Sequence, residues 1–484
     1  MIPAWIQASK EAEIPTGLGV DEALQRALEL RDRLRGTLSA ASFPVDAESV
    51  ETFHALCALL DQPGSDPKGR LADTSAAFEF ISTVDWPRDE FGGRDDLLSR
   101  LAFLCWRHAR QTAEPSAEFR WAKAHSSINR ERALEDGEMI LAIPSLQRAE
   151  KAPQLRLEDP ERLLWVCDLL REQLESAPPI VMNEAVLFHD FIKTPHRRIG
   201  ISDEREYYLG EFALIAGVAC RLLSLREEAR RWFDSAETYF VVLHESRAHM
   251  GRVAYQRLAL QLEERDFGAV SHLAPPLIGS FTVLELPEDA LKCRFLQAIA
   301  LKETGRFDEA KEVFFQIASE ARQLKENRLL ALAAQNLFQL HAFLGEVDEA
   351  VSQAEEASAI FGRLDSRVHL AKVQLGVGYL LRKQHRLAES IEAFRKAQRQ
   401  FAEIQMSADV AATHLVVADL LLDAGDAAQA EREIHAALPV IDDLKLMPEG
   451  IAALSLLRES LHRRQIDRHA LRELEGNFSK NPKD

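Results

Sequence analysis

A pattern that returns every 40 residues constrains this chain more than any other feature. It first stands out as GRFDEAKEVFFQIA and returns three more times toward the C-terminus. The four segments start at Gly305, Gly345, His385 and Gly425. Five positions after each start stands a small residue: Ala310, Ala350, Ser390 and Ala430. A fixed period of this size predicts a solenoid of stacked supersecondary units, because each unit can bury its apolar face only against a neighbour.

Steps of 40 or 41 residues extend the pattern to seven repeats of two helices each. The repeats start at Gly210, Gly251, Leu291, Ala331, Ala371, Ala411 and Ile451. Small residues favour positions 8, 20 and 27, where antiparallel helices would cross closely, and large residues favour position 24. Leu258 and Phe338 depart from this pattern at position 8. A second stripe, Phe240, Phe281, Phe361, Phe401 and Ile441, predicts a second helix of about four turns.

With these residues the chain resembles the tetratricopeptide repeat (TPR) family, in its longer bacterial form, from about Gly210 to Phe478. The resemblance implies an all-α fold: a right-handed α-α superhelical solenoid of TPR-like helical hairpins. Pro275 and Pro276 fall in a second helix and should kink or shorten it. The TPR-like solenoid is expected at residues 159–484, with regular repeats from about residue 203 and a polar C-terminal cap at residues 451–484.

Residues 1–158 are expected to form an N-terminal helical region, which can also be read as degenerate repeats. Helical spacing of apolar residues predicts helices at 21–38, 47–62, 71–83, 94–110 and 118–125, and further helices at 160–175 and 183–193. Gly64 to Arg70 reads as a loop that lacks the Lys and Ser/Thr of a phosphate-binding loop. Residues 143–160 read as a seam before the solenoid. Trp86, Trp106 and Trp121 fit core packing better than a ligand pocket.

Composition narrows the classes of partner. The net charge of −18 argues against direct binding to nucleic acid or to anionic membranes, and it favours a basic partner if it has any role beyond solubility. The five cysteines lie in apolar helical runs without a CxxC pair, which is typical of reduced core thiols. No secretory signal or membrane-spanning run is evident, so we expect a cytoplasmic protein.

Signals for catalysis are weak. The chain has neither GxSxG nor HExxH. His189-Asp190 matches the metal-binding dipeptide of phosphohydrolases, but the other ligands of that site have no recognisable counterpart. His244 and His249 are five residues apart and would not share a helix face. We therefore expect no catalytic residues, no metal and no cofactor, and the chain is not expected to be an enzyme.

The resemblance implies that positions 2, 5, 9 and 12 of the first helices point into a concave groove. In this chain those positions, with one neighbour, supply the partner-binding candidates Tyr255, Lys292, Phe295, Lys302, Gln335, Asn336, Gln339, Lys372, Tyr379 and Arg382. Cations and amides suit an extended acidic or polar segment, or a partner helix. The alternative is a groove filled by the chain's own terminal segment or without specific use. No repeat carries the Lys and Asn pair that the family uses for chaperone tails.

The leading hypothesis is a non-enzymatic scaffold or adaptor that binds a partner protein or peptide in the groove. The alternative is a regulatory TPR protein that senses a ligand or sequesters a partner such as a transcription factor or a protease. A remote alternative is an enzyme within residues 1–158. The sequence leaves the partner, the pathway and the oligomeric state open.

Overall fold

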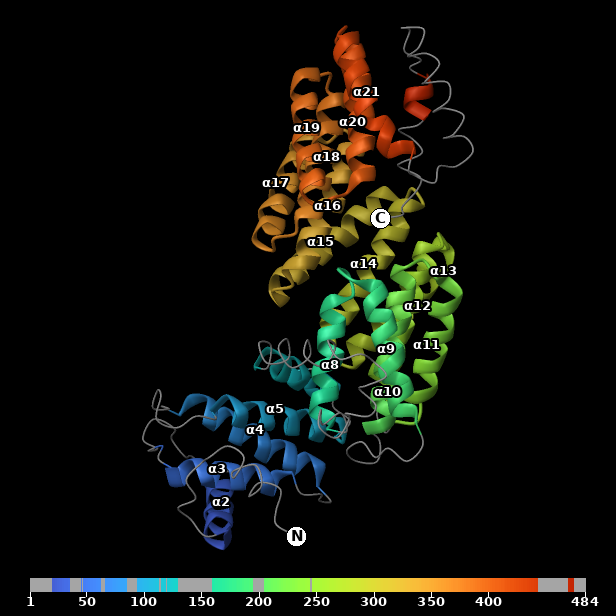
Figure 1. Ribbon diagram of the computed structural model, residues 1–484. Coiled ribbons are helices and arrows are strands. Elements are labelled where there is room, and N and C mark those ends of the chain that lie inside the picture. Colours follow the sequence, from blue (N-terminus) through green and yellow to red (C-terminus); the bar gives the residue numbers. More distant parts are fainter. Residues whose placement is uncertain are drawn as a thin grey trace. The chain divides into compact units, whose positions relative to one another are not determined.

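The computed structural model describes residues 20–34, 45, 47–61, 66–84, 94–112, 115–118, 120–128, 159–194, 204–243, 246–442 and 469–473 (Figure 1). These segments contain helices and turns and no strand. The helices of the N-terminal part are α2 (Val20–Leu34), α3 (Ala47–Leu60), α4 (Pro67–Thr83), α5 (Arg94–Arg110), α8 (Pro160–Gln173), α9 (Pro178–Lys193), α10 (Glu204–Leu222), α11 (Arg226–Phe240), α12 (Arg247–Glu263) and α13 (Phe267–Val283). The remaining helices are α14 (Pro287–Glu303), α15 (Phe307–Leu324), α16 (Asn327–Leu344), α17 (Val347–Arg363), α18 (Arg367–Lys383), α19 (Leu387–Glu403), α20 (Ser407–Asp423) and α21 (Ala427–Asp442).

The chain divides into two compact lobes, an N-terminal lobe, Met1–Ala290, and a C-terminal lobe, Leu291–Asp484. Six of the predicted repeats appear as helical hairpins, which run from α10–α11 to α20–α21 (Figure 1). The predicted all-α, TPR-like repeat fold is therefore confirmed for these six repeats. The seventh repeat start, Ile451, lies outside the described residues.

Each hairpin pairs a small residue with a large one where its two helices cross. Positions 8 and 24 hold Gly217 and Phe233, Leu258 and Ala274, Ala298 and Phe314, Phe338 and Ala354, Gly378 and Phe394, and Ala418 and Ile434. A methyl group on Gly378 would lie 2.9 Å from the ring of Phe394, so only glycine fits beside that ring. Leu258 and Phe338, which depart from the pattern, are matched by alanine at position 24. Total side-chain volume at the crossing is thus conserved although the order is inverted.

The same size rule holds at positions 1 and 31. Here the pairs are Gly210 and Phe240, Gly251 and Phe281, Leu291 and Ala321, Ala331 and Phe361, Ala371 and Phe401, and Ala411 and Ile441. Position 20 is fully buried in every repeat, from Ala229 to Ala470. Its one polar member, Ser390, donates a hydrogen bond from Oγ to the carbonyl oxygen of Gly378 at 2.8 Å, which satisfies the buried hydroxyl.

Turns between helices contain a residue whose backbone lies in the left-handed helical region. Among the described turns, glycine takes this place at Gly305, Gly345 and Gly425, and seven turns use another residue, including Lys325 and His385. The residue that follows donates its N–H to a carbonyl five positions back, as from Arg306 to Leu301 at 2.9 Å. This is the Schellman closure of a helix C-terminus, which satisfies the last carbonyl groups.

The prolines of α13 do not shorten it. α13 spans Phe267–Val283 with Pro275 and Pro276 inside it, and its 17 residues equal the length of α12. Of the expected kink or shortening, the shortening is therefore absent. Two missing N–H donors remove two hydrogen bonds of the helix, while the buried residues Val270, Ala274 and Phe281 still hold its inner face against the core.

The N-terminal lobe differs from expectation at two helix starts. α4 begins at Pro67 rather than at residue 71, because Asp66 caps it by accepting the N–H of Gly69 at 3.0 Å. α9 begins at Pro178 rather than at residue 183, again with proline in the first turn. The prolines open helices here, whereas the sequence analysis placed Pro67 in a loop and Pro178 between two predicted helices.

The predicted core role of the tryptophans is confirmed for two of the three. Trp106 and Trp121 are buried in one hydrophobic cluster with residues of α8, α10 and α12. Trp106 packs edge-on against Tyr207 of α10, with ring centroids 5.3 Å apart. α5 and the first hairpins thus share a core. Trp86, the seam at residues 143–158 and most of the predicted cap at 451–484 lie outside the described residues, and the division near residue 158 stays a prediction.

Candidate functional site

The first helices of successive hairpins lie next to one another in the C-terminal lobe, joined by side-chain bonds. Lys302 of α14 reaches α16, where Nζ donates to Asn336 Oδ1 at 2.7 Å and to Gln339 Oε1 at 3.1 Å. Lys383 of α18 reaches back to α16 and donates to the main-chain carbonyls of Ala342 and Phe343. These contacts form a layer, which we call the first-helix face, from α14, α16 and α18.

Lys302, Asn336 and Gln339 were predicted as site residues, and the structure brings the three together. The ammonium group of Lys302 is held by two neutral amide oxygens, and the nearest carboxylate, that of Glu303, is 3.9 Å away. Burial lowers the pKa of Lys302. Because this largely buried cation is held mainly by neutral oxygens and has a long ion pair with Glu303, a closer anionic group would stabilise it further.

Gln335 lies one helical turn before Gln339 on the same side of α16. Its side chain is buried, and among the described residues no donor reaches its Oε1. A buried amide oxygen without a donor costs free energy, about 1–3 kcal/mol. Gln335 therefore adds an unsatisfied acceptor to a group of amides that already holds Lys302.

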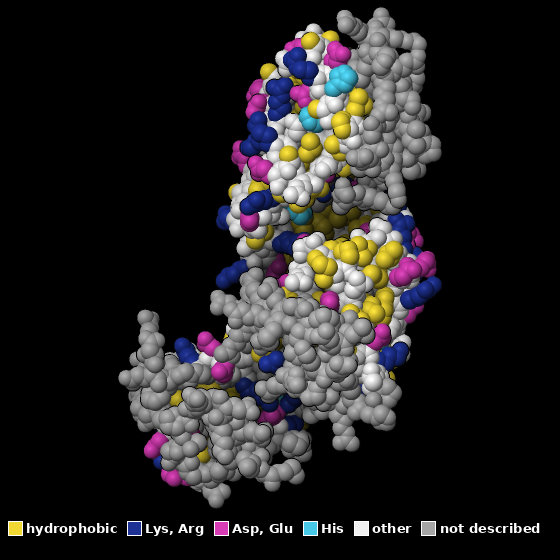
Figure 2. Space-filling model, viewed as in Figure 1, with side chains coloured by type: hydrophobic (Ala, Val, Ile, Leu, Met, Phe, Trp, Pro, Cys, Tyr) yellow, Lys and Arg dark blue, Asp and Glu magenta, His cyan; other side chains and the backbone are white. Residues whose placement is uncertain are grey.

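α18 carries the exposed part of the first-helix face. Lys372 is exposed, and Tyr379, seven residues on, is 39% exposed with its ring edge against Phe394 at 4.9 Å. Neither α16 nor α18 contains Asp or Glu, although together they carry Arg328, Arg367, Lys372, Arg382 and Lys383. The second helices are more acidic; α17 carries four carboxylates and one arginine. Figure 2 shows both signs of charge on the visible face of this lobe.

Arg382 is engaged within the chain rather than available to a partner. It forms an ion pair with the fully buried Asp419 of α20, and Arg472 donates to the same carboxylate at 3.2 Å. Ala470 and Leu471 are buried in one cluster with residues of α20 and α21. The described piece of the C-terminal segment, residues 469–473, therefore packs against α20 and α21, beside the ion pair of Arg382.

The other predicted site residues lie apart from this group or contribute packing. Phe295 of α14 packs edge-on against Phe314, with ring centroids 5.7 Å apart, and supports the core. Lys292 is half-buried one turn before Phe295. Tyr255 is half-buried on α12, in the N-terminal lobe. The assignment of these ten residues to one partner groove stays a prediction.

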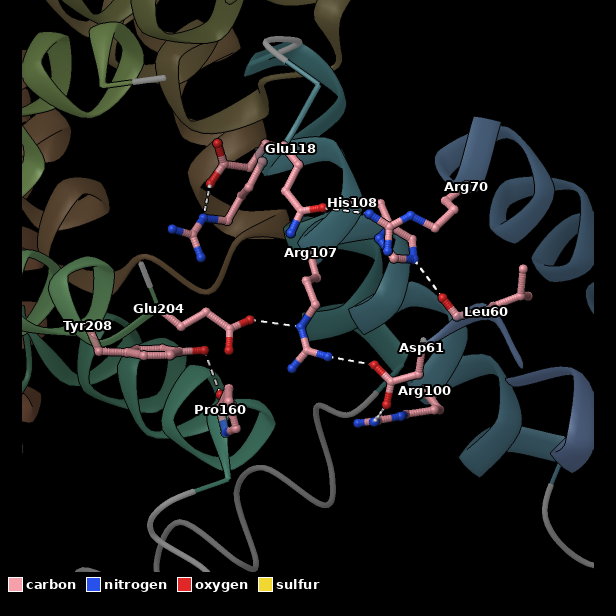
Figure 3. Close-up of polar contacts among 12 residues, drawn as sticks. Leu60, Asp61, Arg70, Arg100, Arg107, His108, Glu118, Pro160, Glu204 and Tyr208 are labelled. Carbon is pink, nitrogen blue, oxygen red and sulfur yellow. Dashed lines mark hydrogen bonds and ion pairs between the residues drawn. The ribbon is translucent and has the colours of Figure 1, made fainter. Parts of the chain in front are cut away.

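The N-terminal lobe contains buried charges that the sequence analysis missed. Arg107 of α5 bridges Asp61, which follows α3, and Glu204 of α10, with distances of 2.6 and 2.8 Å (Figure 3). Glu204 is fully buried, and Tyr208 one turn away donates its hydroxyl to the carbonyl of Pro160 at 2.5 Å. These bonds tie α5 and the chain after α3 to α8 and α10.

A second set of charges, the ionic cluster, consists of Arg110, Glu118, Asp168, Arg171, Glu211, His249 and Arg252. Glu211 of α10 is fully buried; Arg171 of α8 pairs with it, and Arg252 of α12 donates to it at 2.7 Å. His249 lies between Glu211 and Glu118, with nitrogen–oxygen distances of 3.6 and 3.3 Å. Burial raises the pKa of Glu211, but the two arginines and His249 hold it well below its ordinary value.

One signal in the sequence points to this cluster. Arg171, Glu211 and Arg252 stand 40 and 41 residues apart, so opposite charges occupy equivalent places on neighbouring first helices. A search for opposite charges separated by one repeat would have found them. Periodicity analysis of apolar residues could not, because it treats charged positions as solvent-facing.

Within the described segments, no group of three or more His, Cys, Asp or Glu side chains is arranged to hold a metal ion. His189 is buried edge-on against Trp232 and Tyr239, at centroid distances of 5.2 and 5.6 Å, while Asp190 is exposed. His244 lies outside the described residues. All five cysteines are buried. Of the described helices, none is long and apolar enough to cross a membrane.

Comparisons with known proteins give structural likenesses only. No family model and no curated protein matches the chain. Similar solved structures include a Rap protein complexed with competence and sporulation factor, at 14% identity and TM-score 0.48, covering 79% of this chain and 98% of that one. Aspartyl phosphate phosphatase F from Bacillus subtilis is 9% identical, with TM-score 0.45 and coverage of 89% and 96%. A signal transduction ATPase with a tetratricopeptide repeat sensor, from Pyrococcus horikoshii, is 11% identical, with TM-score 0.44 and coverage of 96% and 75%. These values are too low to argue function; the TPR-like fold rests on the chain's own hairpins.

Proposed function

We propose that this protein is a non-enzymatic scaffold or adaptor whose C-terminal lobe binds an extended acidic segment of a partner protein. The observation that carries the proposal is the charge of the first-helix face. α16 and α18 contain basic residues and no Asp or Glu, within a chain of net charge −18. Two helices that carry basic residues and no acidic ones favour acidic partners, because potentials across an interface tend to be complementary.

The side chains on this face suit an extended segment. Lys302 has two amide acceptors and a long ion pair with Glu303, and a partner carboxylate would supply a closer negative charge. Asn and Gln side chains can bond to a main chain through both their oxygen and their nitrogen, which suits Gln335 and Gln339 to a peptide backbone. Tyr379 offers an exposed ring to an apolar side chain of the partner.

Selection of twelve-residue peptides by display on the purified protein tests the proposal. We expect wild type to enrich Asp and Glu, and Lys372→Glu to lose that enrichment. Reversing one exposed charge should weaken the binding of a selected peptide about tenfold, and more salt should weaken it further. Lys396→Glu is the matched control, because Lys396 is an exposed lysine on the second helix of the same repeat.

Two results would reject the proposal. One is selection of basic or purely apolar peptides by wild type. The other is an equal loss of affinity in Lys372→Glu and Lys396→Glu, which would assign the effect to net charge rather than to the first-helix face. The regulatory alternative shares this surface and differs in consequence, since it requires that peptide binding change the activity of a bound partner.

A further inference from the structure

One helix of the N-terminal lobe, α13, carries no charged side chain. It contains no Asp, Glu, Lys or Arg, and every other helix that the structure describes contains at least one of them. Charged residues normally occupy the outer face of a surface helix, where they remain in water. By contrast with α13, the second helix of the preceding repeat, α11, carries both arginines and carboxylates. The outer face of α13 is therefore exceptional in a chain of net charge −18.

This outer face is apolar and exposed. The buried residues of α13 hold its inner face against the core. On the opposite side of the helix lies the α13 stripe, which consists of His272, Pro276, Gly279 and Val283, and all four are exposed. Val283 keeps 78% of its surface exposed, and Leu273, beside the stripe, keeps 44%. A contiguous set of exposed apolar side chains marks an interaction surface.

The apolar surface continues onto the preceding repeat of the same lobe. Val242 is 65% exposed and stands 41 residues before Val283, at the equivalent place at the end of α11. Equivalent positions of stacked repeats are neighbours in space. Three repeats of the C-terminal lobe have polar residues at this place: Gln323, Arg363 and Glu403. The apolar surface is thus a feature of the N-terminal lobe.

The α13 stripe is complementary to itself in size. If two copies of α13 lie antiparallel and cross at the middle of the stripe, Pro276 of one copy is level with Gly279 of the other. His272 is then level with Val283. A methyl group on Gly279 would meet no atom within 4 Å, so the surface has a hollow there. A proline ring opposite this hollow repeats the pairing of large with small residues that the hairpins use within the chain.

Charge favours a second copy of this chain as the occupant of the surface. Two copies of net charge −18 repel each other, and a two-fold contact places each surface against itself. A face without charges avoids this repulsion, and α13 is the described helix that provides one. We infer that two copies of this protein associate through antiparallel α13 helices into a symmetric dimer.

Sedimentation velocity on the full wild-type chain tests the inference. Over a dilution series that reaches about 0.1 mM, we expect a reversible equilibrium between monomer and dimer, since a contact with a Kd of about 10 μM is mostly dimeric at that concentration. A monomer throughout the series would overturn the inference. Assemblies that grow beyond two copies would also overturn it, because a two-fold contact closes with two copies.

Hydrogen exchange on the same wild-type samples locates the contact without any variant. Exchange in α13 should be slower at the high end of the dilution series than at the low end, because the second copy covers the helix. Dimerisation without slower exchange in α13 would overturn the inference.

Gly279→Met fills the hollow of the α13 stripe and should raise the Kd of the dimer about tenfold or more. Gly362→Met is the matched control. Gly362 lies on the second helix α17, and a methyl group on it likewise meets no atom within 4 Å. Equal Kd values for the two variants would overturn the inference.

Two charge variants test the antiparallel arrangement. Val283→Lys should weaken the dimer although it lowers the net negative charge of the chain, and Val351→Lys, at an exposed valine of α17, should not. His272→Glu should weaken the dimer as well. An equal mixture of Val283→Lys and His272→Glu should associate more tightly than either variant alone, because the opposite charges meet across the contact. No gain in the mixture would overturn the antiparallel pairing.

Discussion

Substitution of Gly376 by alanine should destabilise the C-terminal lobe. Gly376 lies in the middle of α18, where alanine normally raises helix stability by about 1 kcal/mol. A methyl group there would lie 2.5 Å from Cε1 and 3.0 Å from Cζ of Phe338, whose ring is buried and cannot move into solvent. Such overpacking costs about 1–3 kcal/mol. The difference is a net loss of up to about 2 kcal/mol in the free energy of unfolding.

The assay is urea unfolding followed by circular dichroism, with hydrogen exchange in α16 and α18 to locate the effect. Gly362→Ala is the control, since a methyl group on Gly362 meets no atom within 4 Å. It should raise stability by up to about 1 kcal/mol. Gly376→Ala should become neutral or stabilising in a Phe338→Leu background, because leucine lacks the atoms that clash. Equal stabilisation by Gly376→Ala and Gly362→Ala would refute the packing argument.

Two further outcomes follow from the turns and from a buried histidine. Lys325 holds a left-handed backbone conformation, so Lys325→Gly should raise the free energy of unfolding by about 1 kcal/mol in urea titrations, and no gain would count against strain at this turn. Burial, with Arg70 nearby, lowers the pKa of His108 to about 4, while the ring hydrogen-bonds the carbonyl of Leu60 at 3.0 Å. His108 therefore takes up a proton near pH 6.5 in the unfolded chain but only near pH 4 in the folded chain. The free energy of unfolding should fall by about 3 kcal/mol as pH drops from 6.5 to 4, and His108→Gln should make it depend less on pH.

Periodicity predicted the hairpins well because it reports a local and repeated requirement. Every described repeat needs a residue at position 20 that fits where two helices cross, and Ala310, Ala350 and Ser390 meet it with full burial. Helix starts in the N-terminal lobe were less predictable. Proline at Pro67 and Pro178 can end one segment or open the next, and only the hydrogen bonds around it decide.

For the candidate site, too, the sequence predicted some contacts and not others. Sequence position placed Lys302, Asn336 and Gln339 on one face, and the structure joins them by hydrogen bonds. The sequence could not show that Arg382 is neutralised by Asp419, because that ion pair depends on how closely two neighbouring helices pack.

By itself the sequence determined the all-α hairpin architecture, its period and the size of the residues at each crossing. These follow from spacing along one chain and from side-chain volume. Only the tertiary structure decided which charges are buried and shared. Glu211 is an ordinary surface carboxylate by sequence, and it becomes the buried partner of Arg171 and Arg252 because three first helices stack side by side. The free energy of a charge depends on what surrounds it in space, and neighbours one repeat away are set by packing rather than by local sequence.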